Sequence, residues 1–356
     1  IFLKFTEIVC LYSSKMKKIL ITGGAGYIGS HTAVELVNAG YEPIIIDNFS
    51  NAEKSTLEGL KNILGREITC YEGDCNDQEL MDEIFSINQI EGVIHFAAFK
   101  AVGESTQFPL KYYSNNIISL LILLETMKKY GVKNLVFSSS CTVYGQPAQL
   151  PVTEDTPRQE AESPYGNTKK ICEDILKDFT ISKSGSRLIA LRYFNPIGAH
   201  KSSEIGELPI GVPANLVPFI TQTAAGWREK LTVFGDDYDT SDGSCIRDYI
   251  HVVDLAAAHV KAISYLDEQP DDFYDIFNVG TGNGNTVLEV IKAFEKVSGQ
   301  SLNYSIGPRR SGDVVKVWAD TSKINKVLGW KPKFDLETAL LDSWNWQKKL
   351  PKPDKP

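Results

Sequence analysis

Residues 17–31 of the chain are KKILITGGAGYIGSH, with glycines at positions 23, 24, 26 and 29 directly after an apolar run. We expect the run to form a buried strand and His31–Ala39 to form the helix after it. Glycines at this spacing allow a sharp turn, close approach of a pyrophosphate, and packing of helix on strand. The helix N-terminus adds free N–H groups and a positive dipole end. The pattern predicts a dinucleotide-binding turn at Gly23, Gly26 and Gly29.

An acidic residue lies where such a turn requires one. Asp47 ends the next apolar run, EPIIIDN, eighteen residues after Gly29. Its carboxylate is placed to bond an adenosine ribose and would repel a 2′-phosphate, so NAD is favoured over NADP. Two later strand ends fit the same cofactor: Asp74 can reach the adenine edge, and the chain from Phe96 would pass the pyrophosphate.

The first half of the chain alternates short apolar runs with helical stretches. The expected strands are KKILITG, EPIIIDN, EITCYEGD, GVIHFAA, NLVFSSS and LIALRYFN. Strands separated by helices, among them Tyr112–Tyr130 and Pro164–Ser182, predict an α/β fold with a parallel, doubly wound sheet. After Asn195, prolines and glycines become frequent. We therefore expect a cofactor domain over 16–195, with chain returns from the C-terminal half, a smaller α/β substrate lobe over 196–347, and a tail over 348–356.

Composition narrows the class of protein. The net charge of −8 argues against a nucleic-acid or anionic-membrane surface. The six cysteines and five histidines are scattered and contain no CxxC pair, so we expect free thiols in a reducing cytosol and no metal site. No apolar run has the length of a membrane span. We expect residues 1–15, before Met16, to be a non-native or disordered extension outside the fold, and the protein to be cytoplasmic.

A second pattern predicts the chemistry. SPYGNTKK places Tyr165 and Lys169 four residues apart at a helix start, hence on one face. A phenol is a poor base at neutral pH, but a nearby ammonium and the positive nicotinamide of bound NAD would lower its pKa. The strand end FSSSCTVYG adds Ser140, which could bond the same substrate oxygen as Tyr165. Together with the glycine turn, these residues predict an NAD-dependent hydride-transfer site.

From Lys17 to about Gln347 the chain resembles the extended short-chain dehydrogenase/reductases and, within them, the UDP-glucose 4-epimerases. The resemblance rests on stretches such as TGGAGYIGSHT, DNFSNA, EGDCND, HFAAFKAVGES, FSSSCTVYG, SPYGNTK, RYFNPIGAH, IRDYIHVVDLA and RRSGD. It implies a Rossmann-type sheet and NAD-dependent interconversion of UDP-glucose and UDP-galactose, in galactose metabolism and UDP-sugar supply. It also implies a homodimer, formed through a bundle of the two long helices.

The resemblance implies a role for individual residues. Ser140, Tyr165 and Lys169 are the implied catalytic group. Besides these and the three glycines, the implied cofactor-binding residues are Tyr27, Ile28, Asp47, Asn48, Asn51, Ala52, Asp74, Cys75, Phe96, Ala97, Ala98, Lys100, Asn115, Tyr193 and Phe194. Besides Ser140 and Tyr165, the implied substrate-binding residues are Asn195, Asn215, Leu216, Phe234, Arg247, Arg310, Asp313 and Val317. Both arginines are forked donors that suit a diphosphate.

Two positions depart from the family. Ala214 stands where the family often has asparagine, which removes one possible uridine or phosphate contact. Val317 occupies the family's gate beside the sugar 2-position, where a tyrosine tends to exclude N-acetylated sugars. We therefore expect UDP-GlcNAc and UDP-GalNAc to be additional substrates.

Three alternatives are weighed against this hypothesis. A 4,6-dehydratase needs an acid–base carboxylate after the strand-end hydroxyl, where this chain has Cys141, Thr142 and Val143. A uronate epimerase would want an extra cation near C6, which the sequence does not locate. A catalytically silent NAD sensor is disfavoured by the intact Ser140, Tyr165 and Lys169.

Overall fold

The computed structural model describes residues 16–310 and 313–352. The predicted extension over residues 1–15 and the last four residues of the predicted tail lie outside the described residues. Of the six cysteines, Cys10 lies outside them as well, and the five described ones are free thiols.

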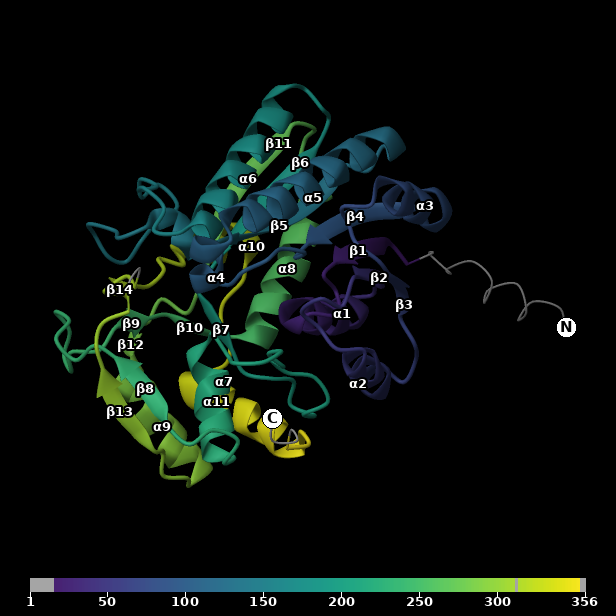
Figure 1. Cartoon of the computed structure of the whole chain (residues 1–356). Coiled ribbons are helices and arrows are strands. Elements are labelled where there is room, and N and C mark those ends of the chain that lie inside the picture. The colour runs from purple at the N-terminus through teal and green to yellow at the C-terminus, as the bar shows by residue number, and fades with distance from the viewer. Residues whose placement is uncertain (1–15, 311–312, 353–356) are drawn as a thin grey trace, which may run out of the picture.

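Seven parallel strands form the central sheet, in the order β11–β6–β5–β4–β1–β2–β3 (Figure 1). Their bounds are β1 Lys18–Thr22, β2 Glu42–Asp47, β3 Thr69–Glu72, β4 Ile90–His95, β5 Asn134–Ser140, β6 Arg187–Tyr193 and β11 Phe273–Val279. All six strands expected from the sequence are present, and the α/β prediction is confirmed. The seventh, β11, returns from the C-terminal half to the edge beside β6.

Successive residues of each strand face opposite sides of the sheet and enter two separate cores. In β1, Ile19 and Ile21 pack in one core and Leu20 in the other. The first core is covered by α1 Tyr27–Asn38, α2 Ser55–Leu64, α8 Val252–Leu266 and α10 Ser322–Leu328. The second is covered by α3 Gln78–Asn88, α5 Pro109–Tyr130 and α6 Pro164–Ile181. The sheet is therefore doubly wound, as expected.

The helix boundaries differ a little from those expected. Helix α1 begins at Tyr27, four residues before the predicted start, because the glycine turn leads straight into it. The short helix α4 (Val102–Gln107) precedes α5, which begins at Pro109 rather than Tyr112. No helix within the described ranges is long and apolar enough to cross a membrane.

A smaller lobe with its own core lies at the lower left of Figure 1. Its helices are α7 Leu216–Ala224, α9 Val287–Ser298 and α11 Leu336–Lys349. Its strands form the pair β8 Leu231–Phe234 with β13 Tyr304–Gly307, and the ladder β12 Asn285–Thr286, β9 Ile246–Arg247, β14 Lys316–Val317. A further pair of strands is formed by β7 Asn195–Ile197 and β10 Tyr249–His251. Strand β7 directly follows β6 and β10 directly precedes α8, so this pair connects the smaller lobe to the large sheet.

In the glycine turn, the backbone at the start of α1 packs directly against the backbone that follows β1. A Cβ on Gly29 would lie 2.4 Å from the carbonyl oxygen of Gly23 and 2.7 Å from Cα of Gly24. Gly23 itself has a φ of +68°, in the left-handed region that favours glycine. The start of α1 can therefore approach β1 this closely only without side chains.

We predict that Gly29→Ala destabilises the fold, because rigid backbone atoms leave no room for the methyl group. The expected loss is about 1–3 kcal/mol in free energy of unfolding, measured by urea denaturation, the range typical of overpacking. Gly103→Ala is the matched control, since a Cβ on that α4 residue meets no atom within 4 Å. Equal stability of the two variants would contradict the prediction.

Candidate active site

The carboxylate of Asp47 braces the glycine turn from the neighbouring strand. It is 8% exposed, and its two oxygens accept hydrogen bonds from the backbone N–H groups of Ala25 (3.0 Å) and Phe49 (2.9 Å). Burial raises its pKa and these bonds oppose the shift. No side chain caps α1 at Gly26, so the first N–H groups of the helix, at Tyr27 and Ile28, are available to an anion.

Two residues predicted at the adenosine, Asn48 and Asp74, belong to one hydrogen-bonded group. Asp74 accepts bonds from the side chain of Asn48 (2.9 Å) and from the backbone and side chain of Asn76 (2.9 and 2.8 Å). Burial raises the pKa of Asp74, but these bonds outweigh it and hold the pKa below its usual value. Asn76 also donates to Asn115 on α5 (3.2 Å). Three predicted cofactor residues, Asn48, Asp74 and Asn115, are thus brought together.

The other residues predicted to bind the cofactor near the adenosine and pyrophosphate lie in the loops after β2, β3 and β4. Asn51 is exposed, Ala52 is half-buried, and burial raises the pKa of the Cys75 thiol to about 12. Phe96, Ala97 and Ala98 follow β4, and the Phe96 ring centroid lies 4.7 Å from that of His259 on α8. The hydroxyl of Tyr27 donates to Gly198 O (2.7 Å), so this side chain reaches the chain segment after β7.

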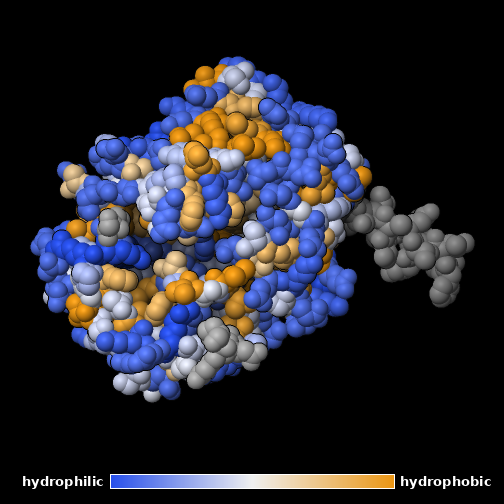
Figure 2. All heavy atoms as spheres, viewed as in Figure 1, coloured by the Kyte–Doolittle hydropathy of each residue, from blue (hydrophilic) through white to orange (hydrophobic). Residues whose placement is uncertain are grey.

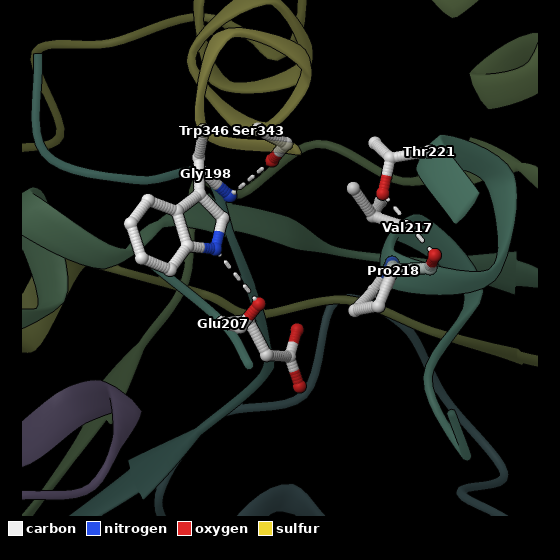
Figure 3. A pocket seen from close by; sticks show the side chains of 7 residues that line it. All are labelled: Gly198, Glu207, Val217, Pro218, Thr221, Ser343 and Trp346. Atoms are coloured by element: carbon white, nitrogen blue, oxygen red, sulfur yellow. Dashed lines mark hydrogen bonds between the residues drawn. The ribbon is translucent and has the colours of Figure 1, made fainter. Parts of the chain in front are cut away.

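Glu207 forms a contact between the two lobes, and the sequence analysis did not predict this contact. Its carboxylate lies 3.7 Å from the Lys100 ammonium and accepts a 2.6 Å bond from Asn215, the residue before α7. Burial raises its pKa. Figure 3 shows Glu207 at the edge of a cavity of about 10 Å³, the size of one water, which also meets Gly198 and Trp346. This cavity is too small for a substrate, and Glu207 instead joins a predicted cofactor residue to a predicted substrate residue.

The predicted catalytic residues converge at the carboxyl end of β5. The Ser163 hydroxyl caps the start of α6 by accepting from Gly166 N (3.2 Å). Tyr165 and Lys169 lie one turn apart on this helix, and Tyr165 forms a hydrogen bond with Ser140. The Lys169 ammonium donates to the carbonyl oxygen (2.6 Å) and hydroxyl (3.2 Å) of Ser138.

Ser140 is held from its other side. Its hydroxyl oxygen accepts bonds from the backbone (3.2 Å) and hydroxyl (3.0 Å) of Thr142, in the 3₁₀ helix η1 (Cys141–Tyr144). Nearby, the Tyr193 hydroxyl bonds the imidazole of His259. Phe194 is buried beside η1.

The protein groups alone do not lower the pKa of Tyr165, and the lowering expected from the sequence included the charge of a bound nicotinamide. Burial raises it to about 12, although a hydrogen bond with Ser140 opposes the shift. Burial also lowers the pKa of Lys169 to about 8, opposed by Cys172 and Glu173. Loss of water disfavours the charged form of each group, and for Tyr165 it outweighs the hydrogen bond with Ser140. A positive nicotinamide ring fits this site, because it would supply the charge that the buried phenolate needs.

Four of the predicted substrate-binding residues form a charged cluster in the smaller lobe: Phe234, Arg247, Arg310 and Asp313. Arg310 donates two bonds to Asp313, from Nε (3.1 Å) and Nη2 (2.7 Å), and an Arg247 nitrogen lies 3.8 Å from the same carboxylate. The Arg310 guanidinium lies 5.6 Å from the ring centroid of Phe234, which is 42% exposed. Two guanidinium groups share one carboxylate, so the cluster keeps an excess positive charge and an exposed aromatic face.

Val317 lies between Arg247 and a buried apolar cluster. It is 5% exposed and pairs with Arg247 across the β9–β14 ladder. It packs in a cluster with Phe194, which precedes Asn195 in the chain, and with half-buried Cys141. Leu216, the first residue of α7, is half-buried against the core of the smaller lobe. The predicted gate residue is thus part of an apolar wall close to Ser140.

Asp248 organises the neighbourhood of Arg247 and was not predicted. It is fully buried and accepts bonds from Thr281 N (2.7 Å), the Thr281 hydroxyl (2.6 Å), Gly282 N (3.0 Å) and Ala319 N (3.1 Å). It therefore ties the chain after β9 to the segments after β11 and β14. The available signal was Asp248 itself, an acidic residue directly before the strand residues Tyr249 and Ile250, because a buried carboxylate must find donors.

Comparison with known proteins agrees with this geometry. A family model described as GDP-mannose 4,6 dehydratase matches residues 20–342. The UDP-glucose 4-epimerase of Bacillus subtilis is 53% identical over 329 residues, covering 92% of this chain and 96% of the relative. The crystal structure of UDP-glucose 4-epimerase from Bifidobacterium longum, in complex with NAD⁺ and UDP, is 47% identical with a TM-score of 0.90, over 94% of this chain and 98% of that one.

A second structure is described as the UDP-Glc/GlcNAc 4-epimerase of Campylobacter jejuni. It is 39% identical with a TM-score of 0.80, over 94% of this chain and all of that one. Identity at this level along nearly the whole chain, together with the converged Ser140, Tyr165 and Lys169, shows that the chain belongs to the UDP-glucose 4-epimerase family.

Proposed function

We propose that this chain interconverts UDP-glucose and UDP-galactose with NAD held at the glycine turn. The observation that carries the proposal is the convergence of Ser140, Tyr165 and Lys169 at the carboxyl edge of the sheet that bears that turn. Its relatives of about 50% identity are UDP-glucose 4-epimerases. NAD, when bound, accepts the hydride from C4 of the hexose and returns it to the opposite face of the ring.

The side chains of this protein move the proton and stabilise the oxygen. The Tyr165 phenolate takes the proton of the C4 hydroxyl as the hydride leaves C4, and gives it back when the hydride returns. The Ser140 hydroxyl donates to the same oxygen, which becomes a carbonyl oxygen in the 4-keto sugar. The Lys169 ammonium adds positive charge on this face of α6. The net redox change is zero, so the cofactor can stay bound between turnovers.

Between the two hydride transfers the 4-keto hexose has to present its other face. The UDP part stays anchored, and Arg247 and Arg310 are suited to hold its diphosphate. Phe234 offers a face for stacking the uracil ring. The hexose end meets Val317 and Phe194, which offer no hydrogen bond that would fix one orientation.

The geometry distinguishes this reaction from a dehydration. The residues that follow Ser140 are Cys141 and Thr142, and the Thr142 hydroxyl donates to Ser140 itself. Elimination of water would need an acid–base carboxylate at this position, which the chain lacks. The match to a dehydratase-named family model is therefore a match of fold and cofactor site.

We predict that Tyr165→Phe abolishes epimerisation while NAD stays bound, because the variant loses the group that moves the proton. Purified protein is incubated with UDP-galactose without added NAD, the sugars are separated by chromatography, and released NAD is measured after denaturation. Tyr71→Phe is the control, since it loses a hydroxyl that accepts from Asn88 (2.9 Å) at the β3 edge. Unchanged turnover in Tyr165→Phe would overturn the assignment.

We further propose that UDP-GalNAc and UDP-GlcNAc are substrates. Valine leaves more room beside the sugar 2-position than the tyrosine that tends to exclude N-acetylated sugars in this family. The described specificity of the Campylobacter jejuni relative, which includes GlcNAc, supports such breadth within this fold.

Val317→Tyr should therefore reduce turnover of UDP-GalNAc by about 100-fold, within the range expected for steric discrimination. Turnover of UDP-galactose should remain within about tenfold of wild type. The two sugars are assayed separately, and Val317→Ala should keep both activities. Wild-type turnover of UDP-GalNAc at the background rate would contradict this proposal.

We also propose a homodimer formed through α5 and α6. Apolar side chains on these helices are exposed: Leu110 (81%), Ile118 (43%) and Leu121 (42%) on α5, and Ile181 (65%) on α6. Figure 2 shows a patch of apolar surface over this helix pair. A contiguous apolar patch of this kind is typical of a protein interface.

Replacing Ile118 and Leu121 together by Glu should give the monomer mass in light scattering at micromolar concentration, because two charges would be buried at the interface. Leu341→Glu, at an equally exposed leucine on α11, should leave the dimer intact. A monomer mass for the wild-type protein would contradict the dimer.

A further inference from the structure

A fully buried ion pair lies directly behind the catalytic residues. Arg192 Nε donates to Oε1 of Glu173 (2.9 Å) and Nη2 donates to Oε2 (2.7 Å), with side-chain exposures of 3% and 1%. Burying two charges costs much of what their attraction returns, so such a pair is weak evidence for stability. The position of the pair behind the catalytic residues suggests that it has a role other than stability.

Each member of the pair lies close in sequence to a predicted site residue. Glu173 lies one helical turn after Lys169 on α6, and Arg192 immediately precedes Tyr193 on β6. Ser139, the neighbour of Ser140, donates its hydroxyl to Oε1 of Glu173 (2.5 Å). One carboxylate therefore holds β5, α6 and β6 together, one residue or one turn from the groups that carry the chemistry.

The network also holds the far end of the Ser140 loop. Arg192 Nη1 donates to the hydroxyl of Tyr144 (2.8 Å), which in turn donates to Asn278 Oδ1 on β11 (2.6 Å). Tyr144 ends η1, the short helix that starts right after Ser140. The loop is thus fixed by Ser139 before Ser140 and by Tyr144 after it.

We propose that Glu173, with Arg192 as its partner, is a positioning residue that fixes Ser140 and the Tyr165–Lys169 face of α6 relative to one another. This inference rests on the proposed function. None of the three side chains Ser139, Glu173 and Arg192 needs to touch the substrate, since each acts through its neighbour.

The charges around Lys169 agree with this role. Burial lowers the pKa of Lys169, while Cys172 and Glu173 on its own helix oppose the shift. From β4, buried His95 faces the ammonium and has its own pKa lowered to about 3, by burial first and by Lys169 second. Arg192 faces Glu173 from β6. Glu173 is therefore the carboxylate that favours the charged amine at this position.

The experiment separates positioning from folding with two sets of variants. Ser139→Ala removes only the hydroxyl bond to Glu173, and Ser139→Thr restores a hydroxyl. Glu173→Leu combined with Arg192→Met replaces the pair by apolar side chains of similar length, a change that is often neutral for stability. The measurements are kcat and KM for UDP-galactose, the content of bound NAD, and the urea midpoint.

We expect kcat to fall about tenfold in Ser139→Ala and about 100-fold in the double variant, because a misplacement of about 1 Å can cost that much. KM and NAD content should stay close to wild type, and Ser139→Thr should recover most of the lost kcat. A purely structural role would lower the urea midpoint and NAD content without this selective loss of kcat.

The control is a second forked ion pair at the amino end of β2. Arg66 donates to Glu42 with Nη1 (2.9 Å) and Nη2 (2.8 Å), away from the carboxyl edge that carries the site. Glu42→Leu with Arg66→Met should leave kcat unchanged. If wild type is active and folded Ser139→Ala keeps its kcat, the positioning role is wrong. If wild type does not turn over UDP-galactose, the proposed function is wrong instead.

Discussion

The contact of the α1 backbone with the turn before it sets the geometry of the cofactor end. The Cα of Gly29 packs so close to Gly23 and Gly24 that no side chain fits between them. The first turn of α1 therefore lies at the carboxyl edge of β1 with its N–H groups uncapped. Asp47 supports the same turn from β2 by accepting from Ala25. A pyrophosphate can then be bound by backbone groups, whose positions do not depend on any rotamer.

The parallel sheet extends this arrangement to the chemistry. Parallel strands end at one edge, so the residues after β1, β2, β4, β5 and β6 meet there although they are up to 170 residues apart in the chain. This is why separate local signals in the sequence could point to residues that lie at one common edge. Each prediction needed only a local signal, such as the glycine turn or the hydroxyls of NLVFSSS, and the sheet then brought the predicted residues together.

What the sequence could not supply was pairing over long distances. The seventh strand, β11, has an apolar pattern of its own, but nothing in that pattern says that it pairs with β6 about 80 residues earlier. The same limit hid Glu173, which looks like a solvent-facing residue in KKICEDILKD. Arg192 was the detectable partner, since an arginine inside the buried strand LIALRYF requires an opposite charge nearby. Glu207 had no such signal, because its loop is irregular.

Burial acts on Tyr165 and Lys169 in one direction, toward the neutral form of each. A site that keeps its phenol protonated is a poor base until positive charge is added on the ligand side. This ties the strength of the base to the oxidised form of the cofactor, which carries that charge, and not to the reduced form. The proton should therefore leave the C4 hydroxyl when the oxidised, hydride-accepting form of the cofactor is present, and return to that oxygen as the hydride goes back to C4 and the cofactor's positive charge is restored. A closed redox cycle needs this coupling, and desolvation of Tyr165 provides it.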